Sequence, residues 1–192
     1  SGTGNVAVGY QAGAAIVGGA KNTIIGYSAG DAFDTGDENT VIGYGAMGAA
    51  DGEEDDNTAI GSNALGQLSG DAAEDNVAIG KEAGWDLTTG NSNTIIGATS
   101  QASASGAVNQ TALGWGTTGV ADNSVTLGNG NVTAVYMSED GGAVISAGGL
   151  GLGLAAVAPA SIVEIRQDVP NIRIASYNTT AGNASDIQLQ RS

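Results

Sequence analysis

A short motif that recurs at nearly constant spacing constrains the fold of this chain more than any other feature of its sequence. Each copy has five residues and ends in a glycine, as in Asn22-Thr-Ile-Ile-Gly26. The aligned copies end at Gly9, Gly26, Gly43, Gly61, Gly80, Gly97, Gly114 and Gly128. These glycines are 17, 17, 18, 19, 17, 17 and 14 residues apart. A period of this length is typical of a solenoid, in which each repeat forms one coil and stacks on its neighbours.

The residues before the repeat glycine, which we number position 0, predict a short strand that is apolar on both faces. Position −1 is aliphatic in every copy: Val8, Ile25, Ile42, Ile60, Ile79, Ile96, Leu113 and Leu127. Position −2 points to the opposite face, and it is also mostly apolar: Ala7, Ile24, Val41, Ala59, Ala78, Ile95, Ala112 and Thr126. One face can line the interior of the coil, and the other must be covered by something else. We therefore expect these residues to form the core and the subunit contacts of a homotrimer, with the −2 face buried on the three-fold axis.

Three further positions of the repeat carry structural expectations. The invariant glycine at position 0 indicates a bend or a close backbone approach that a Cβ atom would block. The asparagine at position −4, present in six copies, either stacks as an amide ladder between coils or caps the preceding turn. A small residue at position +3, such as Ala29, is expected where a second short strand packs tightly.

Acidic residues gather in the turns between the predicted strands. Residues 31–38, 51–56 and 71–75 contain twelve of the 20 acidic residues of the chain. These turns precede equivalent strands, so they should form an acidic ridge along one edge. Clustered carboxylates suit Ca²⁺, but the spacing matches neither an EF-hand loop nor the glycine-rich calcium repeat. We expect solvated turns that discourage wrong edge pairing, and no metal site.

Tyrosines occupy position +1 in the first three repeats. Tyr10, Tyr27 and Tyr44 are in register, so they should form an aromatic ladder along the solenoid. Such a ladder either packs internally or stacks against sugar rings. These three residues are the candidate receptor-binding residues of the chain.

The composition excludes several classes of function. The chain has no His and no Cys, which excludes Ser-His-Asp and Cys-His catalysis and the usual zinc sites. The formal charge of −15 argues against nucleic acid, whose binding needs clustered Lys and Arg. No run of about 18 apolar residues is present, so we expect no membrane insertion. The acidic residues lie in turns without an aromatic cleft, so we expect neither an enzyme nor a cofactor.

The repeats end before the chain does, which predicts three regions. Residues 1–128 form the array of about eight coils. Residues 129–160 form a connector whose second half is too rich in glycine for a stable helix. Residues 161–192 form a small β-rich segment with strands around 161–166, 171–177 and 185–190.

The repeats resemble those of two families of surface proteins. Units such as Asn57-Thr-Ala-Ile-Gly61 resemble the head repeats of trimeric autotransporter adhesins. They resemble still more closely the Asn-Thr-Ala-Ile-Gly-Tyr-x-Ala-Leu repeats of phage tail-fibre proteins. In addition, the segment from Leu152 to Ile165 followed by Asn171-Ile-Arg-Ile is similar to a segment that precedes the C-terminal chaperone domain of phage fibres.

This resemblance implies an all-β fold: a trimeric left-handed parallel β-roll, or solenoid, followed by an intertwined β-rich stalk. It also implies a structural and receptor-binding fibre of a tailed virus, located on the virion beside other tail proteins. Such a fibre attaches to a glycan or protein of the host cell surface. Two alternatives stay open: the head of a bacterial trimeric adhesin on the cell surface, and, less favoured, a polysaccharide-cleaving spike.

Overall fold

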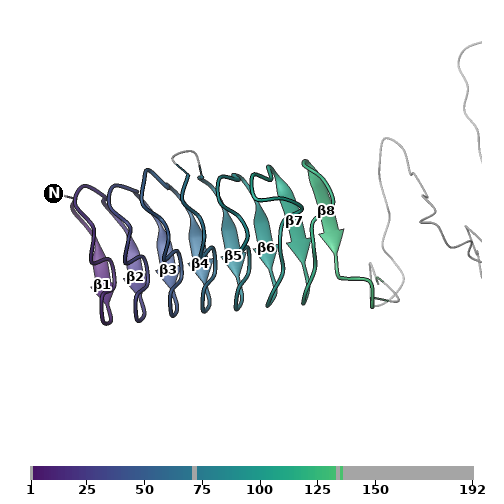
Figure 1. The fold of residues 1–192 in the computed structure, drawn as a ribbon, viewed down its shortest axis with the longest axis horizontal. Helices are drawn as coiled ribbons and strands as arrows, with labels where there is room; N and C mark the ends of the chain where they lie inside the picture. Colours follow the sequence, from purple (N-terminus) through teal and green to yellow (C-terminus); the bar gives the residue numbers. More distant parts are fainter. Residues whose placement is uncertain (1, 71–72, 133–134, 136–192) are drawn as a thin grey trace, which may run out of the picture. The chain divides into compact units, whose positions relative to one another are not determined.

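The computed structural model describes residues 2–70, 73–132 and 135, which form an all-β parallel solenoid of about seven turns (Figure 1). Its eight strands are β1 (Val6–Val8), β2 (Thr23–Ile25), β3 (Thr40–Ile42), β4 (Thr58–Ile60), β5 (Val77–Ile79), β6 (Thr94–Ile96), β7 (Gln110–Leu113) and β8 (Ser124–Leu127). They form one sheet in sequence order, and each strand pairs in parallel with the next. The described residues contain no helix. The predicted solenoid is confirmed, and each motif of the sequence supplies one strand.

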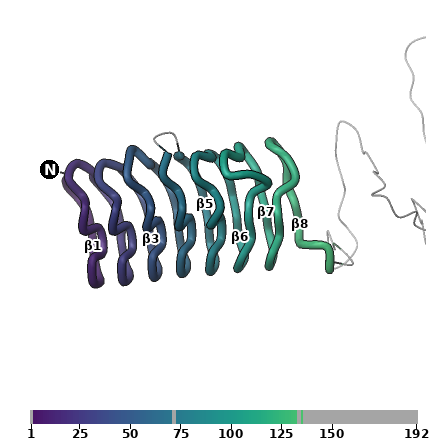
Figure 2. The backbone as a smooth tube through the Cα atoms, viewed as in Figure 1, coloured from purple at the N-terminus to yellow at the C-terminus, as the bar shows by residue number. Residues whose placement is uncertain are grey.

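Strand register follows the repeat glycines and not the length of the turns. Ile25 pairs with Ile42 across a 17-residue period, and Ile60 pairs with Ile79 across a 19-residue period. The shortened last repeat keeps the pattern, because Leu113 pairs with Leu127. Extra residues are therefore absorbed in the turns, and Figure 2 shows the coils lying side by side along one axis.

The −2 residues line the interior of the solenoid. Ile24, Val41, Ala59, Ala78, Ile95 and Ala112 are all fully buried within the chain itself. Phe33, Leu68 and Leu87 from the turns complete the same core. The expectation that the −2 face lies on a three-fold axis is therefore wrong, and the face left for other molecules is the −1 face. Alternation along a strand separates two faces, but both are apolar here, so it did not show which one points inward.

The asparagines at position −4 form the ladder that the sequence left open as one of two roles, and two of them have the capping role as well. The Oδ1 atom of Asn39 accepts the backbone N–H of Asn57 at 2.8 Å, and the Oδ1 atom of Asn57 accepts that of Asn76 at 3.0 Å. The side-chain amide of Asn57 also donates to the carbonyl of Asp55 in the preceding turn, at 2.9 Å. The same Oδ1 bond recurs from Asn5 to Gln110. The asparagines thus form a ladder, and Asn39 and Asn57 also cap their own turns.

The repeat glycines occupy a backbone conformation that other residues rarely adopt. From Gly9 to Gly114 their φ angles lie between +128° and +144°, a region essentially restricted to glycine. A Cβ atom on Gly43 would lie 2.4 Å from the carbonyl oxygen of Gly61 in the next coil. Both the conformation and the close approach require glycine, as the sequence predicted.

The small residues at position +3 do not lie beside a second strand, so that expectation is wrong. Each coil has one strand, and Ala29 lies in a turn between Ser28 and Gly30. Both neighbours have positive φ angles, 49° and 50°, and left-handed backbone on either side prevents an extended strand. The turns nevertheless stack, because the N–H of Gly30 donates to the carbonyl of Ala46 at 2.9 Å.

The predicted connector and C-terminal segment lie almost entirely outside the described residues. Of the connector, residues 129–132 and 135 are described. The strands expected around 161–166, 171–177 and 185–190 remain predictions.

Removing one rung of the asparagine ladder should destabilise the solenoid. In Asn57→Ala, the buried N–H of Asn76 loses its acceptor, which should lower the free energy of unfolding by about 1–3 kcal/mol. Chemical denaturation followed by circular dichroism measures this difference. The exposed Gln67 supplies the control, since Gln67→Ala should change the stability by less than about 0.5 kcal/mol. Equal effects of the two substitutions would contradict the role of the ladder.

Adding a single methyl group at a repeat glycine should cost more than removing a ladder residue. We expect Gly43→Ala to lower the free energy of unfolding by about 3 kcal/mol or more, because it combines backbone strain with a clash against Gly61. Gly130→Ala is the matched control: a Cβ atom there has no heavy atom within 4 Å. Thermal unfolding of both variants tests the prediction, and a Gly43→Ala protein as stable as the control would refute it.

Candidate binding face of the solenoid

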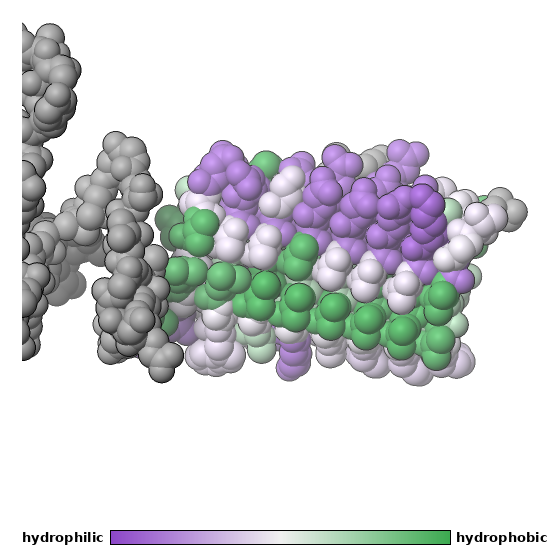
Figure 3. Space-filling model, turned by 180° about the vertical axis from the view of Figure 1, so that it is seen from behind, coloured by the Kyte–Doolittle hydropathy of each residue, from purple (hydrophilic) through white to green (hydrophobic). Residues whose placement is uncertain are grey.

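A continuous apolar band runs along the outer face of the sheet. Figure 3 shows this hydrophobic band along the array, with a hydrophilic band beside it. The band consists of the −1 residues, of which Val8 and Leu127 at the two ends are 56% and 46% exposed. Ile25, Ile79 and Ile96 are 37–38% exposed, and Ile42, Ile60 and Leu113 are half-buried. Parallel in-register pairing places one aliphatic side chain per coil in this row, so it forms one contiguous patch.

The structure divides the predicted core and interface residues between two sides of the sheet. Ile24, Val41 and Ile95 lie inside the solenoid. The outer band contains Ile25, Ile42, Ile60, Ile79, Ile96, Leu113 and Leu127. The outer row at position −3 is mostly threonine: Thr23, Thr40, Thr58, Thr94 and Thr111, with valine in the other copies. The outer face therefore offers a strip of methyl groups beside a strip of hydroxyls.

The three tyrosines form the predicted aromatic ladder, and it lies on the surface. Tyr10, Tyr27 and Tyr44 are 63%, 52% and 60% exposed. Their ring centroids are 5.0 Å apart between Tyr10 and Tyr27 and 5.6 Å apart between Tyr27 and Tyr44, with interplanar angles of 24° and 11°. The faces of the rings are thus turned toward one another along the ladder. A partner meets mainly ring edges and hydroxyls.

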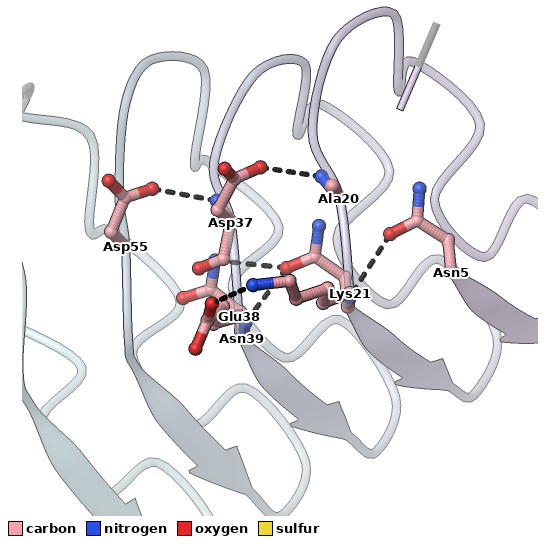
Figure 4. Close-up of polar contacts among 8 residues, drawn as sticks. Asn5, Ala20, Lys21, Asp37, Glu38, Asn39 and Asp55 are labelled. Carbon is pink, nitrogen blue, oxygen red and sulfur yellow. Dashed lines mark hydrogen bonds and ion pairs between the residues drawn. The ribbon is translucent and has the colours of Figure 1, made fainter. Parts of the chain in front are cut away.

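The acidic residues of one edge take part in the stacking of the coils (Figure 4). The Oδ1 atom of Asp37 accepts the backbone N–H of Ala20 at 2.6 Å. Asp55 does the same for the N–H of Asp37, also at 2.6 Å. Beside them, the Lys21 ammonium pairs with Glu38 of the next coil, and this contact raises the pKa of Lys21. We call Asp37, Glu38, Asp55, Asp56, Glu74 and Asp75 the acidic row.

The same type of hydrogen bond, from a backbone N–H to an aspartate of the next coil, recurs near the end of the array. An oxygen of Asp122 accepts the backbone N–H of Val108 and the side-chain amide of Gln110, both at 2.9 Å. These two donors hold the pKa of Asp122 below its ordinary value, since hydrogen bonds to a carboxylate favour its charged form. Aspartates at this edge therefore bond the backbone of the preceding coil.

The described surface offers no enclosed site for chemistry. No cavity or cleft is found in the described part of the chain. Within residues 2–70, 73–132 and 135, no three acidic side chains converge closely enough to hold a metal ion. In the same ranges, no helix has the length and hydrophobicity that crossing a bilayer requires. The outer surface of the solenoid instead presents three rows of side chains: the apolar band, the tyrosine ladder and the acidic row.

Comparison with known proteins leaves the family of this chain open. Its sequence matches no protein-family model, and a search of curated proteins finds no match. A function can therefore be inferred only from the face described above and from the resemblance of the repeats.

The burial of Glu54 was not predicted from the sequence. Glu54 belongs to the acidic turn 51–56, yet its side chain is fully buried. A signal was present: position −7 is glycine or alanine in every other copy, including Gly36 and Ala73. A single glutamate in a column of small residues points to a side chain with a separate role.

Proposed function

We propose that the protein is a structural and receptor-binding fibre of a tailed virus. Three copies of a left-handed β-roll pack side by side and attach the virion to a glycan or protein of the host cell surface. Other tail proteins of the virion are the protein's proposed partners. The proposal is supported by the resemblance of the repeats and of the segment that begins at Leu152, and by a parallel solenoid that fits such a roll.

The apolar band is the observation that carries the proposal. It extends over eight strands that are about 4.8 Å apart, or roughly 34 Å. An apolar patch of this extent on a soluble protein marks an interaction site. A second copy of the chain is a suitable partner, because it presents the same straight band with the same repeat, so methyl groups of facing copies can interdigitate along the whole length.

Charge favours parallel over antiparallel association of the copies. The acidic row lies on one side of the apolar band, as the hydrophilic strip of Figure 3 illustrates. If two copies met face to face in opposite directions, each acidic row would oppose the same row of its partner. Like charges in such a position are destabilising. Association about an axis parallel to the solenoid brings the acidic row toward the tyrosine side of the neighbour instead, which avoids this repulsion.

The tyrosine ladder is the proposed contact with the host receptor. Its phenol hydroxyls and ring edges recur at the spacing of the coils, on a rigid scaffold that holds them in place. Three copies multiply each weak contact, because simultaneous binding raises the effective concentration of the remaining sites. Catalysis has no place in the proposal, since attachment needs only a displayed surface.

The molar mass in solution tests the assembly. We expect light scattering to give about three times 18.6 kDa, with no change on addition of a chelator. Ile60→Asp combined with Ile79→Asp should yield monomers with an unchanged circular dichroism spectrum, because it places carboxylates within the apolar band. Val17→Asp combined with Val120→Asp is the control, since these two valines are 72% and 75% exposed and lie off the band. A wild-type monomer would overturn the proposed assembly.

Attachment is tested on cells. Fluorescently labelled protein should bind a subset of a panel of bacterial strains, and replacement of Tyr10, Tyr27 and Tyr44 by serine should reduce binding at least tenfold without changing the molar mass. Equal binding by the wild type and the triple variant would remove the tyrosines from the receptor contact. Antibodies against the array separate the two origins: they label virions for a tail fibre and the bacterial surface for an adhesin.

A further inference from the structure

Glu54 is the one Asp, Glu, Lys or Arg side chain that is buried among the described residues, and it is fully so. It stands at position −7, where the coil before has Gly36 and the coil after has Ala73. Its backbone is part of the regular structure, because the carbonyl of Glu54 accepts the side-chain amide of Asn39 at 2.7 Å. The equivalent carbonyl of Gly36 accepts the amide of Asn22 in the same way. The backbone of Glu54 therefore matches that of the other coils, and only its side chain differs from theirs.

The buried carboxyl is only half satisfied. Its Oε2 atom accepts the backbone N–H of Gly52 at 3.0 Å. Its Oε1 atom is buried and has no hydrogen-bond partner among the described residues. An ionised carboxylate that is buried without full hydrogen bonding carries a large free-energy cost. A protonated carboxyl avoids most of that cost, since it holds no charge.

No cation compensates the carboxyl. The two ion pairs of the described residues are Lys21–Glu38 and Lys81–Glu82, and neither includes Glu54. Among the described residues, the charged groups on its own turn and on the adjacent ones are acidic: Asp51, Glu53, Asp55 and Asp56 on its own turn, Asp31, Asp34, Asp37 and Glu38 before it, and Glu74 and Asp75 after it.

Burial raises the pKa of the Glu54 carboxyl above its ordinary value, and the charge of Asp51 adds to this effect. The backbone N–H groups of Gly52, Glu54 and Asp51 oppose it without reversing it. A raised pKa in the folded state means that docking of this side chain stabilises the protein fully below the ordinary glutamate pKa. That contribution is lost as the pH rises through the raised value.

We propose that Glu54 is a pH-sensitive latch of the fourth coil. In its protonated form the side chain inserts into the interior of the solenoid and holds the turn 51–56 against the stack. When the carboxyl loses its proton, the charged side chain moves into water and the turn 51–56 opens. The remaining coils keep small residues at this position and stay closed, so the response is confined to one turn. This inference does not depend on the proposed viral function.

Amide hydrogen exchange of the turn as a function of pH tests the latch. Corrected for intrinsic exchange, the opening constant of residues 51–56 should rise about tenfold per pH unit between the ordinary and the raised glutamate pKa, because opening releases one proton. Above the raised pKa it should level off. Glu54→Gln cannot ionise and should show no such rise. Glu53→Gln, which removes an exposed carboxyl of the same turn, should behave like the wild type.

Two results would overturn the latch. The first is the same pH dependence of opening in the wild type and in Glu54→Gln. The second test uses the wild type alone, so it holds even if a variant does not fold: carbon-13 NMR of labelled glutamate carboxyls should show Glu54 titrating above the ordinary glutamate value. Titration of Glu54 at the ordinary value would remove the physical basis of the latch.

Discussion

The hydrogen bond from each buried asparagine oxygen to the backbone N–H of the asparagine in the next coil sets the geometry of the array. Strands of three or four residues are too short to fix, by their own pairing, the register of coils of 14 to 19 residues. The Oδ1 atom of Asn39, 2.8 Å from the nitrogen of Asn57, extends the pairing by one residue inside the solenoid, where water cannot compete. At the other end of the strand, the glycine at position 0 lets the backbones approach. The turns that connect each of these glycines to the next asparagine are free to vary in length.

Regular stacking also explains why the outer surface is organised in rows. Once register is fixed, any residue type that recurs at one repeat position becomes a stripe along the axis. The −1 position produces the apolar band, the −3 position a strip of threonine hydroxyls, and the +1 position the stacked rings of Tyr10, Tyr27 and Tyr44. The proposed assembly and attachment use these stripes, and neither requires a cavity.

Much of this fold could be predicted from the sequence, because a strict glycine register encodes parallel pairing directly. The orientation of the strand faces could not, because Ile24 and Ile25 are equally apolar and only the path of the turns decides which points inward. The expectation of a second strand was wrong for a related reason: the positive φ of Ser28 has no clear signal in a serine side chain. Handedness, the trimer and the receptor remain predictions. The exposed tyrosine ladder was foreseen as one of two alternatives, whereas buried Glu54 was hidden among its acidic neighbours.

The direction of the hydrogen bonds between coils has a mechanical consequence. Because strands and asparagines bond from one coil to the next, these bonds point along the long axis of the array. Tension applied along that axis would break the hydrogen bonds of one coil after another. The coils would therefore separate in many small steps, and not all at once. An unbroken apolar contact between neighbouring copies would spread the same force over several chains. Side-by-side packing would then decide how much pull such a rod withstands.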